Sequence, residues 1–191
     1  MYLYHSLPPN LTGTTLYPLN MMKGIIDDIF QDQAKKYEGR EQLMQTKIPK
    51  LGCLWNDVLH FSPISFEQMY NALYDSLTKY APENLKIKYP IHRKFLKIDS
   101  ELLNQDNLCI FLNQVEIPTY NFTGFEDQFI IFQNEKEIIQ IDISPTQIDK
   151  YNEAFQKGRR LLIYSHSPHV FYKGYIELEK FGICNFSYYS T

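Results

Sequence analysis

Short apolar runs are the feature of this sequence that most limits what the chain can fold into. Examples lie within residues 128–132 and 160–164, and polar residues, Gly or Pro separate each run from the next. Runs of roughly four to eight residues suit buried β-strands, whereas a helix that spans a bilayer needs about 20 apolar residues. The sequence therefore predicts a globular domain built around short strands, with no membrane partner.

Two segments carry clear helical signals instead. Ser65 and Gln68 are spaced as a capping box, with Ser at the N-cap and Gln at the third helical position. The apolar and aromatic residues that follow recur at helical spacing: Phe66, Met69, Tyr70, Leu73, Leu77 and Tyr80. Ser144 and Pro145 repeat the start signal, and Gly158 marks the end of that second helix. These patterns predict helices over about 66–80 and 145–157.

The remaining elements follow from weaker patterns. Asn20 is a candidate N-cap for a helix over about 21–37, and a short helix is expected at 39–46. Strands are expected over 1–5, 53–62, 95–98, 108–112, 129–132, 138–143, 160–164, 170–178 and 183–188. Helices thus come early and strands late, which is typical of α+β proteins. We expect a single α+β domain over residues 1–191, with a mixed or mostly antiparallel sheet and N-terminal helices.

Composition excludes some classes of protein. The chain has 15 Tyr, 13 Phe and 1 Trp, which is too much aromatic surface for a disordered protein. Its formal net charge of −3 argues against a generally basic nucleic-acid binder, although a local basic patch is compatible with it.

Cysteine usage and the N-terminus bear on the compartment. The three cysteines are widely spaced and form no Cys-x-x-Cys pair, so neither a disulfide framework nor a structural zinc site is expected. The opening residues, MYLYHSLPPNL, do not resemble a signal peptide. We expect a reduced, cytoplasmic protein; a protein secreted without a cleaved leader would share these features.

Histidines are the main candidates for chemistry. Four of the five lie beside Pro or Ser at the ends of expected strands: His5, His60, His166 and His169. Strand ends are where a scaffold presents functional side chains, and imidazole there can donate, accept or transfer a proton near neutral pH. The alternative is that each is a structural histidine with its hydrogen bonds satisfied.

Alternation along the expected strand 53–62 places some side chains together. Asn56, His60 and Ser62 fall on one face, with His60 and Ser62 about 7 Å apart along the strand. They would line one ligand site, with His60 and Ser62 as catalytic candidates and Asn56 as a ligand-binding residue. The alternative is a solvated face of an edge strand.

Charged residues supply further candidates. Glu177 and Glu179 alternate in an expected strand and so face the same way, as a buried acid–base pair or as an exposed polar face. Arg40 lies in a compact charged turn, where it either clamps an anionic ligand or pairs with Glu38 or Glu41.

A basic stretch from Lys86 to Lys97 is interleaved with Tyr89 and Phe95. Cations beside aromatic rings suit phosphate contacts and base stacking, so a weak nucleic-acid surface is one interpretation and a solvated strand face is the other.

Several common sites are absent from the sequence. No His-x-His or His-Glu-x-x-His spacing occurs, so no metal is expected. The chain also has no Gly-rich phosphate loop and no Gly-x-Ser-x-Gly turn. P-loop hydrolysis, Rossmann dehydrogenation and α/β-hydrolase chemistry are therefore disfavoured.

Three short motifs resemble those of a small uncharacterised bacterial family. Leu-Tyr-His, Leu-His-Phe-Ser and Ser-Pro-His-Val-Phe-Tyr-Lys-Gly correspond to that family's Ile-Tyr-His, Ile-His-Cys-Ser and Phe-Pro-His-Leu-Tyr-Gly. The matching positions are His5, His60, Ser62, Pro168, His169, Tyr172 and Gly174. The family's fold is related to the ADP-ribosyltransferases and RNA 2′-phosphotransferases, so the resemblance implies an ADP-ribosyltransferase-like fold.

The resemblance also implies an activity. In the wider group a first-motif His contacts the NAD ribose, a second-motif strand carries Tyr or Ser, and a late Glu polarises the ribose. His5 and Ser62 match the first two roles, and Glu177 is a loose match for the third. An enzyme that takes NAD as substrate, or a phosphorylated nucleotide or nucleic-acid end, is therefore expected, with Tyr172 and Gly174 in ligand binding. The chain is longer than the family, with extra material in residues 11–50 and 86–128.

Two other functions are compatible with the sequence. A two-histidine phosphoesterase uses paired His-x-Ser/Thr motifs, of which His60-Phe-Ser62 is one and for which no good second copy exists. A noncatalytic module would use the aromatic side chains as a ligand platform.

Overall fold

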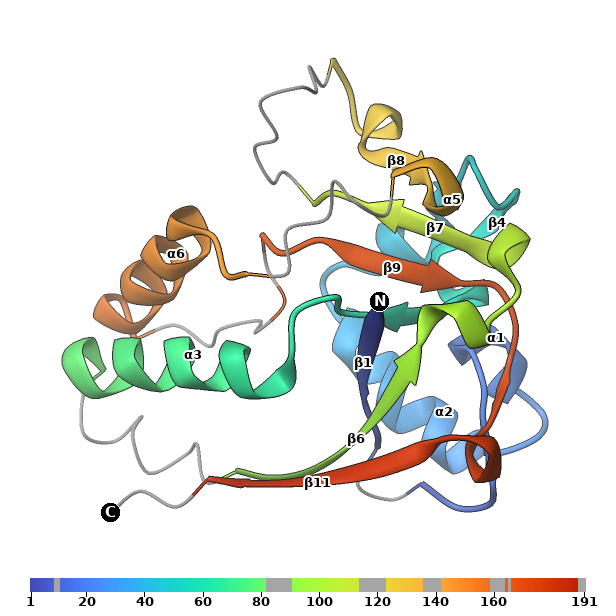
Figure 1. Cartoon of the computed structure of the whole chain (residues 1–191), viewed down its shortest axis with the longest axis horizontal. Helices are drawn as coiled ribbons and strands as arrows, with labels where there is room; N and C mark the ends of the chain where they lie inside the picture. The colour runs from blue at the N-terminus through green and yellow to red at the C-terminus, as the bar shows by residue number, and fades with distance from the viewer. Residues whose placement is uncertain are drawn as a thin grey trace.

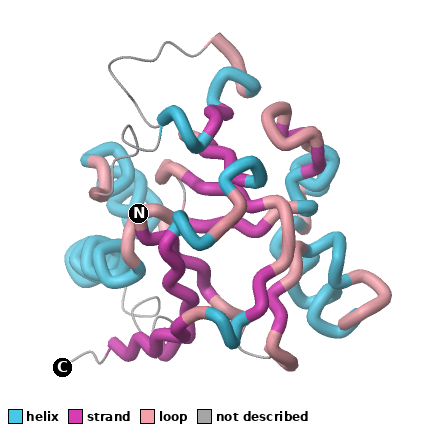
Figure 2. The backbone as a smooth tube through the Cα atoms, turned by 45° about the vertical axis from the view of Figure 1, so that its right-hand side comes forward, coloured by secondary structure: helices cyan, strands magenta, loops and turns pink. Residues whose placement is uncertain are grey.

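The structure is a computed structural model. It describes residues 1–8, 11–81, 91–113, 123–135, 142–158, 164 and 166–188, and for 91–93, 134–135 and 186–188 it describes the backbone alone. Within these ranges the strands lie between two groups of helices (Figure 2).

A three-stranded antiparallel sheet has the order β1–β6–β11, formed by β1 (Tyr2–Ser6), β6 (Ile91–Asp99) and β11 (Gly182–Tyr188). In this sheet β1 confirms the strand that was expected over residues 1–5. Leu3 and His5 of β1 lie opposite Ile98 and Leu96 of β6, and these residues alternate with Tyr2 and Tyr4 on the other face. This register carries His5 on the same face of the sheet as Leu3, which is fully buried.

A four-stranded antiparallel sheet has the order β5–β9–β7–β8. Its strands are β5 (Leu59–Phe61), β9 (His169–Tyr172), β7 (Leu108–Phe111) and β8 (Phe129–Ile131). The backbones of Tyr4 and Ser62 exchange two hydrogen bonds of 2.8 Å, which join β1 to the chain just after β5. The two sheets therefore meet along this edge (Figure 1).

The two faces of the four-stranded sheet have different neighbours. Leu59, Phe61 and Val170 belong to the core shared with Leu3 and Leu96 of the three-stranded sheet. The opposite face packs against residues from the loops before β5, in a second cluster: Ile48, Leu51, Val58, Cys109, Phe111, Phe129 and Phe171. Two small two-stranded antiparallel sheets complete the strands, β2 (Thr15–Leu16) with β10 (Ile176–Glu177) and β3 (Lys47–Ile48) with β4 (Cys53–Leu54).

The two helices with clear sequence signals are confirmed. They are α3 (Phe66–Tyr80) and α6 (Pro145–Gln156), which pack side by side through their aromatic faces (Figure 1). Ser65 and Gln68 form the expected capping box, with Ser65 Oγ accepting from the Gln68 N–H at 3.2 Å. Ser144 Oγ accepts from the N–H of Gln147 in the same way. A short helix, α5 (Phe132–Glu135), follows β8.

The prediction of one continuous helix over 21–37 is wrong. Gly24 adopts a φ of +81°, which ends α1 (Leu19–Met22) before α2 (Asp27–Ala34) begins. A 3₁₀ turn (Lys35–Tyr37) replaces the rest. The short helix expected over 39–46 is present as a 3₁₀ helix (Glu41–Gln45). Asn20 lies inside α1 rather than capping it, and its amide donates to Asp57 at 2.7 Å.

The prediction of one continuous strand over 53–62 is also wrong. A 3₁₀ turn (Trp55–Asp57) interrupts it, because the Asp57 carboxylate accepts the Leu54 N–H at 2.8 Å and closes a local turn. The expected strand 170–178 likewise divides into β9 and β10. The expectations for 95–98, 108–112, 129–132 and 183–188 are confirmed as β6, β7, β8 and β11, whereas 138–143 and 160–164 lie mostly outside the described residues.

The structure thus confirms an α+β chain with antiparallel sheets. In the part of the chain that it describes, no helix has both the length and the apolar character to cross a membrane. Cys53, Cys109 and Cys184 are all free thiols, and Cys109 is fully buried.

Candidate functional site

His5 lies where the two sheets meet. It follows Tyr4, the residue that bridges to Ser62, and its Nδ1 is 2.7 Å from the carbonyl oxygen of His60. Because a carbonyl only accepts, His5 Nδ1 carries the proton and donates it, and Nε2 of the neutral ring is left with a lone pair. The ring packs on Phe61, with centroids 5.4 Å apart.

His60 lies in the middle of β5 and is fixed in the same manner. Its Nε2 is 3.0 Å from the carbonyl oxygen of Trp55, so Nε2 is the donor and Nδ1 keeps the lone pair. The Trp55 ring packs beside it at 5.1 Å, and the Phe171 ring of β9 lies 4.7 Å away. The 3₁₀ turn that interrupts the expected strand is therefore what brings the Trp55 carbonyl to His60.

His169 begins β9 and faces the same side of the sheet as Phe171, two residues further on. Its ring is 6.4 Å from the His60 ring and donates a hydrogen bond to the Tyr164 backbone carbonyl. We call His5, His60 and His169 the histidine cluster: His60 and His169 share one face of the four-stranded sheet with Phe171, and His5 lies at the junction of the two sheets, packed on Phe61. All three residues are half-buried.

Burial lowers the pKa of every imidazole in the histidine cluster. The pKa falls from 6.5 to about 4 for His5, about 3 for His60 and about 4 for His169. Lost hydration of the charged form is the largest cause in each case, and at His60 repulsion from His169 and His5 adds to it. All three rings are therefore neutral at pH 7.

Neutral imidazoles with one nitrogen donating to a carbonyl have a defined chemistry. The second nitrogen accepts a hydrogen bond or takes a proton, and it cannot donate. Each of the three imidazoles thus keeps one acceptor nitrogen, and its other nitrogen is held by a backbone carbonyl. Such a site favours a ligand with hydrogen-bond donors, such as hydroxyl groups.

Positive charge borders the histidine cluster on one side. The Lys36 ammonium lowers the pKa of both His5 and His60, which places its charge within range of the two rings. Arg40 follows in the same turn, and its guanidinium donates to the Lys36 carbonyl. The Arg40 guanidinium therefore hydrogen-bonds within its own turn.

Tyr37 connects that segment to Trp55. Its hydroxyl is hydrogen-bonded to the Trp55 side chain, and its ring is half-buried. Burial raises the pKa of Tyr37, while the nearby Arg40 charge opposes the rise. The Tyr37 phenol is therefore protonated at pH 7.

Ser62 and Asn56 differ from their expected roles. The Ser62 hydroxyl is 2% exposed and is used locally, since it donates to the Ile64 carbonyl at 2.9 Å and accepts the Ile64 N–H at 3.1 Å. Asn56 lies in the 3₁₀ turn, where strand alternation does not apply, and it is also 2% exposed. Its Oδ1 has no hydrogen-bond donor among the described residues.

Tyr172 and Gly174 lie away from the histidine cluster. Tyr172 alternates with His169 and Phe171 along β9 and therefore faces the core between the sheets. Gly174 has a φ of +149°, and a Cβ there would be 3.1 Å from the Tyr172 ring. The pair is a packing contact on the face of the sheet opposite His60 and His169.

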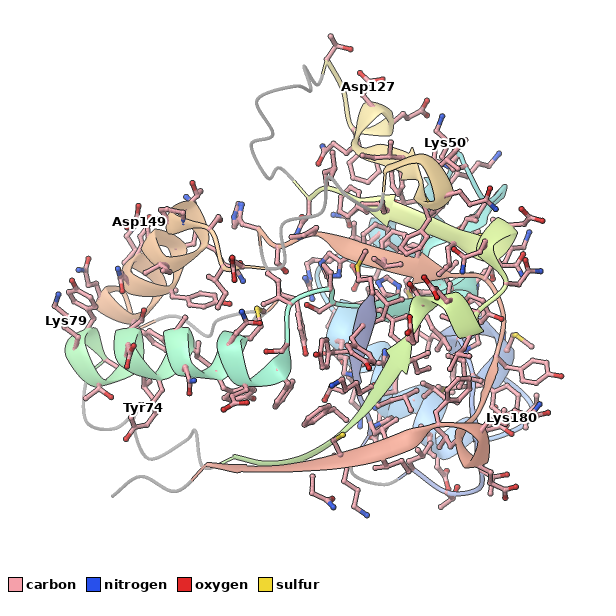
Figure 3. All side chains as sticks on the ribbon, viewed as in Figure 1. Lys50, Tyr74, Lys79, Asp127, Asp149 and Lys180 are labelled. Carbon is pink, nitrogen blue, oxygen red and sulfur yellow. The ribbon has the colours of Figure 1, made fainter. Side chains whose placement is uncertain are left out.

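Glu177 and Glu179 were expected to face the same way along one strand, but they do not lie in one strand. Glu177 ends β10, and Glu179 falls in a 3₁₀ turn (Leu178–Lys180). The Glu177 side chain is 44% exposed and forms an ion pair with Lys180. Lys180 lies near the start of β11, at the rim of the molecule (Figure 3).

The basic stretch is described only in part. Lys86, Lys88 and Tyr89 lie outside the described residues, and the rest of the stretch forms β6. Lys97 packs over the Tyr2 ring, with its Nζ 4.0 Å from the ring centroid. That cation is therefore held against a neighbouring strand.

Sequence reasoning missed the groups that fix the imidazoles. The carbonyls of Trp55 and Tyr164 leave no trace in a sequence, because every residue has one. Trp55 did offer a signal, since it is the single tryptophan of the chain and lies five residues before His60. In the described residues no group of three or more His, Cys, Asp or Glu side chains is arranged to hold a metal ion.

Searches for relatives of this chain find no matching protein family, curated protein or solved structure. Any function proposed for this chain therefore rests on the arrangement of its own residues.

Proposed function

We propose that the histidine cluster binds the ribose of a nucleotide and that the protein is an ADP-ribosyltransferase-like enzyme acting on NAD or on a phosphorylated nucleotide or nucleic-acid end. One observation carries the proposal: the neutral imidazoles of His60 on β5 and His169 on β9 lie 6.4 Å apart, and His5 of β1 donates to the His60 backbone carbonyl where the two sheets meet. Chain segments more than 50 residues apart supply them, with His5 and His60 separated by 55 positions.

The proposed roles follow from the free nitrogens. His5 Nε2 and His60 Nδ1 accept hydrogen bonds from ribose hydroxyls, since both rings are fixed as acceptors by their carbonyl partners. His169 lies beside His60 and takes a hydroxyl proton as charge develops, because a neutral imidazole is the base form. Lys36 and Arg40 supply the positive charge that phosphate groups need.

The position of Glu177 narrows the class of substrate that we propose. In the ADP-ribosyltransferase group a late Glu polarises the ribose, whereas here that carboxylate is paired with Lys180 at the surface. Polarisation would then come from His60 and His169. This favours a phosphorylated nucleotide or nucleic-acid end over a plain NAD glycosidic transfer.

The test is turnover with radiolabelled NAD, alone and with 2′-phosphorylated RNA, in the presence of cell extract. We expect product with the wild-type protein and loss of at least about 100-fold with His60→Asn or His169→Asn, the range typical for an acid–base group. His166→Asn is the matched control, because His166 has a φ of +57° that Asn tolerates and lies outside the histidine cluster. No turnover, together with no thermal shift from NAD or ADP-ribose, would overturn the proposal.

A two-histidine phosphoesterase is the second candidate. The adjacency of His60 and His169 on neighbouring strands favours it, since such enzymes use one imidazole as base and one as acid. The local use of the Ser62 hydroxyl argues against it. Cleavage of a 2′,3′-cyclic nucleotide that His60→Asn abolishes would establish this activity in place of the transferase.

A further inference from the structure

His169 depends on a carbonyl that lies in a loop. Tyr164 supplies that carbonyl five residues before the start of β9, so no strand hydrogen bond holds it directly. If the loop shifted, His169 would lose the partner that fixes its donor nitrogen. The structure therefore needs a separate device that holds the Tyr164 carbonyl in place.

Asn113 provides this device from the neighbouring strand. It follows the end of β7, where Phe111 lies opposite His169, and its Nδ2 donates to the carbonyls of Tyr164 at 3.3 Å and of Ser167 at 3.0 Å. Ser167 is fully buried, and its Oγ donates to the same Tyr164 carbonyl at 3.0 Å. One side-chain amide thus holds both ends of the turn that leads into His169.

Backbone geometry makes this arrangement specific. Asn113 has a φ of +52°, and His166, inside the turn, has a φ of +57°. They are the two non-glycine residues with positive φ in the described part of the chain. Asn is the non-glycine residue best suited to this conformation, and its amide reaches two carbonyls from there.

We propose that Asn113 is a positioning residue for His169: by holding the Tyr164 carbonyl it selects which imidazole nitrogen of His169 is free to meet the ligand. Without the amide, both neutral tautomers of His169 become accessible and the ring can turn. The inference rests on the proposed function only for the identity of the ligand, because the tautomer is a property of the free protein.

The experiment compares the tautomers of the three clustered histidines in the free protein by ¹⁵N NMR of the imidazole nitrogens. In the wild type we expect one neutral tautomer at each ring. In Asn113→Gly, which tolerates the positive φ and lacks the amide, we expect His169 to show averaged nitrogen shifts while His5 and His60 stay unchanged. A single, unaltered His169 tautomer in the folded variant would overturn the inference.

Two further variants keep the test decisive. Ser167→Ala removes one donor to the Tyr164 carbonyl and retains Asn113, so it should give a smaller change at His169 and serves if Asn113→Gly does not fold. Asn104→Gly is the matched control, because Asn104 caps a turn at the other end of β7 and should leave all three tautomers unchanged. A change at His169 as large in Asn104→Gly as in Asn113→Gly would contradict the proposed role.

Ligand affinity separates this inference from the proposed function. With ADP-ribose as probe and Trp55 fluorescence as readout, Asn113→Gly should weaken binding about fivefold, as expected for one displaced hydrogen-bonding group. If the wild-type protein does not bind ADP-ribose, the proposed function is overturned. The tautomer result alone then decides the role of Asn113. Wild-type binding with unchanged affinity in Asn113→Gly would overturn the positioning role.

Discussion

Proton binding to the three clustered imidazoles is unfavourable in the folded protein. Their pKa values of about 4, 3 and 4 lie below the ordinary value of 6.5, so between these limits the unfolded chain binds more protons than the folded one. The stability that the neutral imidazoles contribute is therefore fully present above about pH 6.5 and is lost progressively as the pH falls toward 3.

This predicts an acid-sensitive fold whose sensitivity depends on His60. Urea unfolding at several pH values should show the free energy of unfolding falling below about pH 6.5. In His60→Asn the fall should be smaller, by up to about 1.4 kcal/mol for each pKa unit removed. His166→Asn is the comparison, since the pKa of that half-exposed imidazole is lowered less severely. Equal pH dependence in both variants would contradict the burial of His60.

Gly174 gives a residue-scale test of which side of the sheet binds ligand. Gly174→Ala should destabilise the protein, because a Cβ would press on the Tyr172 ring at 3.1 Å in a backbone of positive φ. Gly13→Ala is the control for backbone strain alone, since its φ is +83° and nothing lies within 4 Å. Gly174→Ala should cost about 1 kcal/mol more than the control in thermal or urea unfolding and leave ADP-ribose affinity unchanged. If ADP-ribose affinity were lost while stability stayed unchanged, Tyr172 and Gly174 would belong to the ligand site.

Residue-level prediction from the sequence succeeded where position alone was enough. Of the histidines singled out in the sequence, His60 and His169 lie 6.4 Å apart because their antiparallel strands are neighbours, and His5 reaches the His60 carbonyl. The expected roles of Asn56 and of the Glu177–Glu179 pair depended on strand alternation, and local turns replace the strands at Asn56 and Glu179. Ser62 stays in a strand-like bridge, but its hydroxyl is used by Ile64. Side-chain contacts inside turns are set by tertiary packing and carry little periodic signal.

At the scale of elements, α3 depends on its N-cap. Ser65 and Gln68 satisfy two backbone N–H groups that the first turn leaves without helical partners. Ser65→Ala should lower the free energy of unfolding by about 1 kcal/mol, measured by urea denaturation. Ser65→Asp should retain most of the stability, because Asp is an equally good N-cap. An unchanged stability in Ser65→Ala would show that the helix is held by packing against α6 alone.

Elements with signals at both ends were predicted closely, as α3 and α6 illustrate. The helix expected over 21–37 was divided because Gly24 adopts a left-handed conformation, which the apolar spacing on either side did not reveal. The strand expected over 53–62 was interrupted by a side-chain contact from Asp57. Both errors come from local turn chemistry that outweighs the pattern of hydrophobic residues.

At the scale of the whole molecule, the site exists because two sheets share an edge. Tyr4 and Ser62 join β1 to the chain after β5, and His5 and His60 are the residues on either side of that junction. The α+β class was evident from the order of helices and strands, but this junction was not. Pairing between segments more than 50 residues apart is decided by tertiary structure, which short motifs do not encode.

The most direct test of the account is a titration of the free protein with ADP-ribose, followed by the fluorescence of Trp55. Trp55 is the single tryptophan and packs 5.1 Å from His60, so the protein's tryptophan emission reports on the surroundings of His60. The account predicts a saturable change with one site in the wild type and in His166→Asn, and at least about a tenfold weaker response in His60→Asn. No saturable change up to about 1 mM ADP-ribose, or equal affinity in all three proteins, would contradict it.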